Sequence, residues 1–150
     1  MTEIILFLDV DGVLNNPMSE SDFSDFNLGN LKNLVEKLSP KVVISSDWRR
    51  YPSRLEQLRI KLLSIGVEIF DTTICSNGER KNEIKEWLVS HTWNLAVIID
   101  DMVAKRADPK INNCYFRQIN YRLGLTEDDV DDIVATLHKL TKGQENDKSE

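Results

Sequence analysis

Short apolar runs alternate along this chain with segments in which apolar residues recur at helical spacing. Apolar runs predict five β-strands, at residues 4–8, 42–44, 67–70, 95–99 and 114–119. Apolar residues three or four positions apart predict four helices, at residues 28–38, 53–65, 78–90 and 127–140. Strands that alternate with helices of this length indicate an α/β fold, in which helices cover both faces of a parallel sheet of about five strands.

Two helices have recognisable sequence signals at their ends. Ser53 and Glu56 have the spacing of a capping box that opens the second helix, and Gly66 ends it. Thr126 and Asp129 form a similar capping pair before the last helix.

Length and composition fit one folded domain. The chain has 150 residues, of which 41% are hydrophobic and 29% are charged, enough to bury a proper core. We expect the domain to span residues 1–143, and the polar segment 144–150 to be a disordered tail. No repeat or linker divides the chain, so we expect no second domain. We also expect the protein to be a monomer.

Charge and cysteine content narrow the choice of partners and compartment. The net charge is −6, and the isoelectric point of about 5.0 argues against a nucleic-acid partner. Cys75 and Cys114 have no metal-type or redox-type spacing, which favours reduced thiols in the cytoplasm. The first apolar run stops at Asp9, so it is neither a signal peptide nor a membrane span. We expect no membrane partner, and export by a non-classical route is left open.

Polar side chains follow three of the predicted strands. The carboxyl ends of parallel strands meet at one edge of a sheet, where α/β proteins bind ligands. The side chains expected there are Asp9 and Asp11 after the first strand, Ser45 and Ser46 after the second, and Asp100 and Asp101 after the fourth. Arg80 and Lys81, at the start of a helix, can reach the same edge.

These residue types suit phosphoryl transfer. A carboxylate can attack phosphorus, but two anions meet, so the approach needs a cation. Mg²⁺ prefers one or two carboxylates with waters and substrate oxygens, and Asp9 and Asp101 could supply the carboxylates. Asp11 points the same way as Asp9 in an extended backbone, and Gly12 allows a sharp turn. One acid can therefore attack while the other transfers protons.

Four segments resemble the motifs of the haloacid dehalogenase (HAD) superfamily, in their usual order and spacing. They are LFLDVDGVL, VISSDWR, ERKNEIKEWL and VIIDD. The resemblance spans Ile4 to about Leu140 and is closest to small phosphatase-like members, including the HAD domain of RNA-repair proteins, with LGLTEDDV as a further similar stretch. It implies a Rossmann-like three-layer sandwich. It also implies a Mg²⁺-dependent phosphomonoester hydrolase that acts through an aspartyl-phosphate.

The resemblance assigns roles to the acidic residues. Asp9 matches the nucleophile, and Asp11 matches the general acid/base, whose backbone carbonyl also meets Mg²⁺. Asp101 matches the acidic metal ligand, with Asp100 beside it.

The phosphate-binding roles leave two alternatives open. Ser45 matches the phosphate-binding hydroxyl, although Ser46 could replace it. Arg80 and Lys81 compete for one basic role, because the family more often has lysine there, whereas the spacing to the following helix favours Arg80.

Trp48 and Arg49 could line the entrance of the site. The arginine would meet phosphate, and the indole would stack on an aromatic leaving group. The alternative, to which we give equal weight, is a structural role in which Trp48 covers a helix end and Arg49 forms a surface ion pair.

The segments at which family members carry a cap domain are short here. Residues 15–27 and 71–79 cannot hold a domain, so the resemblance implies an open site without a cap. An open site can admit a phosphorylated macromolecule whose own bulk excludes water. The acidic charge favours a phosphoprotein, with phosphotyrosine first if Trp48 stacks, or a small phosphate ester, over nucleic-acid ends.

Two other functions fit parts of the pattern. A receiver-like domain, which accepts a phosphoryl group on aspartate without catalysis, also places carboxylates at strand ends, but its basic residue normally follows the last strand. A metal-dependent nuclease would need two metals and more carboxylates than the sequence places.

Overall fold

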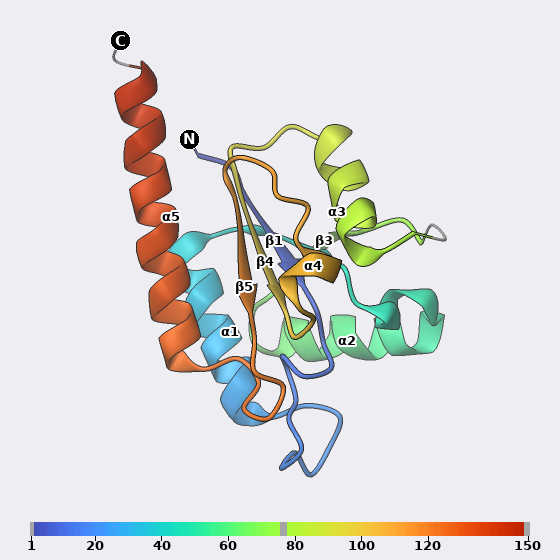
Figure 1. The fold of residues 1–150 in the computed structure, drawn as a ribbon. Coiled ribbons are helices and arrows are strands. Elements are labelled where there is room, and N and C mark those ends of the chain that lie inside the picture. Colours follow the sequence, from blue (N-terminus) through green and yellow to red (C-terminus); the bar gives the residue numbers. More distant parts are fainter. Residues whose placement is uncertain (1, 76–77, 149–150) are drawn as a thin grey trace.

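The computed structural model describes residues 2–75 and 78–148, and it places a five-stranded parallel sheet at the centre of the protein (Figure 1). The strand order is β3-β2-β1-β4-β5. The strands are β1 (Ile4–Leu8), β2 (Lys41–Ile44), β3 (Ile69–Thr72), β4 (Leu95–Asp100) and β5 (Cys114–Gln118). All four pairings are parallel, which confirms the predicted Rossmann-like α/β fold.

Helices cover both faces of the sheet, which gives three layers (Figure 1). The helices are α1 (Asp25–Leu38), α2 (Pro52–Ser64), α3 (Arg80–Val89), α4 (Ala104–Ala107) and α5 (Glu127–Lys148), with a 3₁₀ turn, η1 (Asp47–Arg50). The core against α1, α2 and α5 contains Leu6 and Leu8 of β1, and the core against α3 contains Ile5 and Phe7. This alternation follows from the two-residue side-chain period of a strand. It makes β1 an anchor for both cores and fixes the direction in which the chain leaves its end.

Helix boundaries match the sequence in some places and differ in others. Thr126 and Asp129 do form the predicted capping pair, since the Asp129 N–H donates to Thr126 Oγ1 at 3.2 Å and the Thr126 N–H donates to Asp129 Oδ2 at 2.9 Å. The predicted Ser53 capping box was wrong. The N-cap of α2 is Tyr51, without a side-chain cap, and Pro52 occupies the first turn. Proline suits that position because its missing N–H would have no helical partner.

Two further segments differ from expectation. The third strand begins at Ile69, not at Val67, because the Val67 N–H donates to the Leu62 carbonyl at 2.9 Å and so closes the end of α2. Helix α5 continues to Lys148, so residues 144–148 of the expected disordered tail are helical; Gln144 donates to the Asn94 carbonyl at 2.9 Å. Residues 149–150 lie outside the described part of the chain.

The part of the chain that the structure describes contains no cap domain, as predicted. Only residues 9–24 connect β1 to α1, and only residues 73–75 lie between β3 and the undescribed residues 76–77. Among the described residues, no helix is long and apolar enough to span a membrane.

Candidate active site

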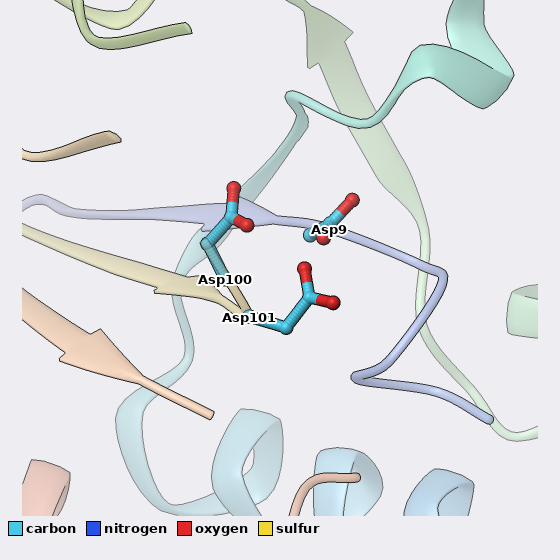
Figure 2. Close-up of side chains that lie close together, drawn as sticks. All are labelled: Asp9, Asp100 and Asp101. Atoms are coloured by element: carbon cyan, nitrogen blue, oxygen red, sulfur yellow. The ribbon is translucent and has the colours of Figure 1, made fainter. Parts of the chain in front are cut away.

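Three carboxylates meet at the carboxyl ends of β1 and β4 (Figure 2). Asp9 follows β1, Asp100 ends β4 and Asp101 follows it. One oxygen from each lies within 4.8 Å of the others. The backbone brings them together because the two strands pair in parallel and the Asp9 N–H donates to the Ile99 carbonyl at 3.2 Å. Asp9 and Asp100 are buried and Asp101 is partly exposed.

Arg80 lies against this acidic cluster. Its Nη1 is 2.8 Å from Asp100 Oδ2 and 3.3 Å from Asp9 Oδ1. Burial alone would lower the pKa of Arg80, but Asp9 and Asp100 outweigh burial and raise it, so the guanidinium keeps its charge. Lys81 points elsewhere and pairs with Glu79 at 3.4 Å. Of the two basic candidates, Arg80 is therefore the one at the cluster.

Burial and like charge oppose ionisation of the carboxylates. Burial, followed by the charge of Asp100, raises the pKa of Asp9 well above its ordinary value, although Arg80 acts in the opposite direction. Burial and the charge of Asp100 also raise the pKa of Asp101. The cluster is thus short of positive charge, and its all-oxygen donor set fits a hard divalent cation such as Mg²⁺.

Gly12 allows the turn after β1 to approach Asp101 closely. Its φ is +80°, and a Cβ added there would lie 2.8 Å from Asp101 Cγ and 3.0 Å from Tyr121 Cβ. A side chain at position 12 would therefore displace the acid. The Asp-Val-Asp-Gly turn needs its glycine for this contact as well as for its backbone conformation.

Asp11, two residues beyond Asp9, is exposed, and both of its carboxylate oxygens accept hydrogen bonds. Asn15 Nδ2 donates to Oδ1 at 3.0 Å, and Trp48 Nε1 donates to Oδ2 at 3.1 Å. These two bonds hold the Asp11 carboxylate, which is not a member of the acidic cluster.

The two candidate serines have different surroundings. The hydroxyl of Ser46 accepts the Trp48 N–H at 3.2 Å and caps η1. Ser45 Oγ is fully buried and has no hydrogen-bond partner within the described structure. The Ser45 N–H donates to the Leu8 carbonyl at 3.1 Å, which places this serine beside the end of β1. A buried hydroxyl without a partner is costly, so Ser45 is the better candidate for binding a ligand oxygen.

Trp48 and Arg49 face inwards. The guanidinium of Arg49 donates to the carbonyls of Ser45, Ser46 and Thr73 at 2.8–3.0 Å and pairs with buried Glu83 at 2.8 Å. Trp48 is 3% exposed. These contacts leave little of either side chain for a substrate, and they differ from both the predicted entrance role and the predicted surface ion pair of Arg49.

The sequence reasoning did not single out Asn15, Asp47 or Glu83. Asp47 Oδ1 lies 3.6 Å from Arg80 Nη2 at the rim of the site, and Glu83 holds Arg49 in the loop after β2. Glu83 follows Arg80 by one helical turn, a spacing that places both on one face of α3 and could have indicated a shared environment.

Comparison with known proteins places this chain in a family. The family described as the HAD domain in Swiss Army Knife RNA repair proteins matches residues 5–130, a span that contains Asp9, Arg80 and Asp101. Neither the curated proteins nor the solved structures gave a match. The match covers most of the chain and confirms the HAD resemblance. The protein therefore belongs to this family of HAD domains.

Proposed function

We propose that the protein is a Mg²⁺-dependent phosphomonoester hydrolase that acts through an aspartyl-phosphate on Asp9. The observation that carries this proposal is the acidic cluster of Asp9, Asp100 and Asp101 against Arg80, at the sheet edge where α/β proteins bind ligands. A nucleophile, a set of metal ligands and a fixed cation then occupy one small region.

The donor set fits Mg²⁺. Asp9 and Asp101 would hold the ion, together with the Asp11 carbonyl, and Asp100 lies beside them. When bound, Mg²⁺ would offset the charge of the attacking carboxylate and of the phosphoryl oxygens.

The chain's own residues can carry both chemical steps. An Asp9 oxygen attacks phosphorus, the bond from phosphorus to the ester oxygen breaks, and Asp11 gives its proton to that leaving oxygen. Asp11 then takes a proton from a water that attacks the same phosphorus, the bond to Asp9 breaks, and phosphate leaves. Arg80 stabilises charge in both transition states, and Ser45 Oγ donates to a phosphoryl oxygen.

We place the phosphorylated end of a nucleic acid first among substrates, ahead of the phosphoprotein or small ester that net charge alone favoured. Two points support this reversal: the matching family is described from RNA repair proteins, and the Trp48 ring is covered. Phe23 lies 5.4 Å from this ring and Arg54 lies 4.9 Å from it, which removes the reason for preferring phosphotyrosine. Release of phosphate from end-phosphorylated oligonucleotides and from phosphopeptides should be compared. Faster release from the phosphopeptides would instead favour a phosphoprotein substrate over nucleic-acid ends.

The mechanism is tested by replacing Asp9. Purified protein should release phosphate from an aryl phosphate with Mg²⁺ and lose this activity in EDTA. Asp9→Asn should abolish it, while Asp131→Asn, an exposed charge-matched change on α5, should leave it intact. Full activity of Asp9→Asn would refute the nucleophile assignment. Phosphorylation of Asp9 without turnover would instead favour the receiver-like alternative, and cleavage of unphosphorylated nucleic acid would favour the nuclease.

A further inference from the structure

The carboxylate of Asp11 is fixed although it lies at the surface. An exposed aspartate ordinarily changes rotamer freely, and each orientation aims its oxygens differently. Here Oδ2 accepts the indole N–H of Trp48 at 3.1 Å, and Oδ1 accepts an amide N–H of Asn15 at 3.0 Å. Hydrogen bonds to both oxygens restrict the rotation of the group.

The two donors are themselves held in place. Trp48 is almost fully buried, with Phe23 on its ring at 5.4 Å and the Arg54 guanidinium at 4.9 Å. This packing fixes the orientation of the Trp48 ring, and therefore the direction in which its indole N–H points.

Both the oxygen and the nitrogen of the Asn15 side-chain amide form further hydrogen bonds. Its Oδ1 accepts the Gly12 N–H at 2.9 Å, and its Nδ2 also donates to the Asp22 carbonyl at 3.0 Å. Asn15 and Asp22 belong to the loop between β1 and α1.

We propose that Trp48 and Asn15 are positioning residues that hold the Asp11 carboxylate ready for proton transfer before any substrate binds. This inference rests on the proposed hydrolase function. A carboxylate has about four lone-pair sites, so two accepted hydrogen bonds leave room for the proton that it transfers. A proton donor works only when it is aimed at the leaving oxygen. Because the described residues form no cap that closes over the site, the loop between β1 and α1 and the turn η1 hold the Asp11 carboxylate in this orientation before substrate binds.

Trp48→Phe removes the N–H and keeps a ring between Phe23 and Arg54. The test compares kcat on two substrates, p-nitrophenyl phosphate and β-glycerol phosphate. The nitrophenolate leaves readily without a proton, whereas the alkoxide does not. We expect kcat on β-glycerol phosphate to fall about tenfold or more, the order expected for losing a hydrogen bond to a charged group, and kcat on the aryl ester to fall much less. KM should change little for both.

Trp87→Phe is the matched control. Trp87 Nε1 also donates to a carboxylate, Asp71 Oδ2 at 2.8 Å, but on α3 and away from Asp11. Loss of one buried indole N–H should reduce thermal stability in both variants, whereas the difference between the two substrates should appear only in Trp48→Phe. A second variant, Asn15→Asp, serves if Trp48→Phe does not fold. It keeps an oxygen acceptor for the Gly12 N–H but removes the N–H that donates to Asp11. Its kcat should also fall more on β-glycerol phosphate than on p-nitrophenyl phosphate.

A double-mutant cycle separates positioning from general damage. In an Asp11→Asn background, Trp48→Phe should cause no further fall on β-glycerol phosphate, because the group that it positions is already absent. Equal falls on both substrates, or an additive effect in that background, would overturn the positioning role while Asp9→Asn still abolished turnover. Absence of any Mg²⁺-dependent phosphate release by the wild-type protein would instead refute the hydrolase function.

Discussion

Gly12→Ala should disrupt the site because the added Cβ would clash with Asp101. Gly66 provides a control for the backbone cost of the same substitution. Gly12 and Gly66 have nearly the same backbone, with φ of +80° and +82°, but very different surroundings. A Cβ on Gly12 would overlap the Asp101 carboxyl group, whereas a Cβ on Gly66 would meet nothing within 4 Å. Gly66→Ala therefore carries only the backbone cost, and Gly12→Ala carries that cost together with the steric one.

The expected magnitudes differ enough to measure. An alanine in the left-handed region costs about 1–2 kcal/mol. Forcing an atom into packed structure adds about 1–3 kcal/mol. The free energy of unfolding should then fall by about 1–2 kcal/mol in Gly66→Ala and by about 2–5 kcal/mol in Gly12→Ala. For a chain of this size, each kcal/mol corresponds to about 3 °C in Tm.

Urea unfolding gives these free energies, and a Mg²⁺ titration of Tm gives the consequence for the site. We expect Mg²⁺ to raise the Tm of the wild-type protein, because ligand binding to the native state alone is stabilising, and Gly66→Ala should keep that rise. Gly12→Ala should lose most of that rise, since its Cβ displaces Asp101. Equal destabilisation in the two variants with Mg²⁺ binding intact would refute the close approach of Gly12 to Asp101.

Two further predictions concern charge. Because burial and Asp100 raise the pKa of Asp9, its contribution to metal-free stability is present at low pH and is lost as the pH rises through that raised pKa. Mg²⁺ favours the ionised carboxylate, so the rise in Tm that it causes should be larger at pH 8 than at pH 5, and an equal rise would contradict this. Arg49→Met should lower the free energy of unfolding by about 3 kcal/mol or more, because it breaks the buried Arg49–Glu83 ion pair and removes the hydrogen bonds of the guanidinium to three backbone carbonyls. Arg59→Met, which breaks an exposed pair, should change little in the same urea experiment.

The fold could be predicted because each element carries a local pattern. The five residues of β1 were predicted to the residue, since the apolar run has a charged residue at each end. Boundaries set by backbone bonding were predicted less well. Val67 is as apolar as a strand residue, but its N–H closes α2, and no side-chain pattern reports where a backbone N–H donates.

The sequence predicts which strand ends form the site, but it does not predict which side chains contact one another there. The parallel register brings Asp9 to Asp100 and Asp101, as expected from their positions after buried strands. Arg49 and Arg80 are both buried arginines beside motif residues, yet only Arg80 meets the carboxylates, while Arg49 holds the carbonyls of the loop after β2. Which guanidinium faces which group depends on how α3 packs, a tertiary property.

In the proposed mechanism, the electrostatics of the cluster would link metal binding to the reactivity of Asp9. Arg80 contacts two of the three carboxylates, Asp9 and Asp100, yet burial and the charge of Asp100 still raise the pKa of Asp9. A protonated Asp9 is a poor nucleophile and a poor metal ligand, so the same burial opposes both functions. If Asp9 and Asp101 hold a divalent cation, as proposed, the ion would favour the ionised form of Asp9, the form that can attack. Under the proposed mechanism, we therefore expect hydrolysis without a metal to be slow, even if substrate still binds at Arg80 and Ser45.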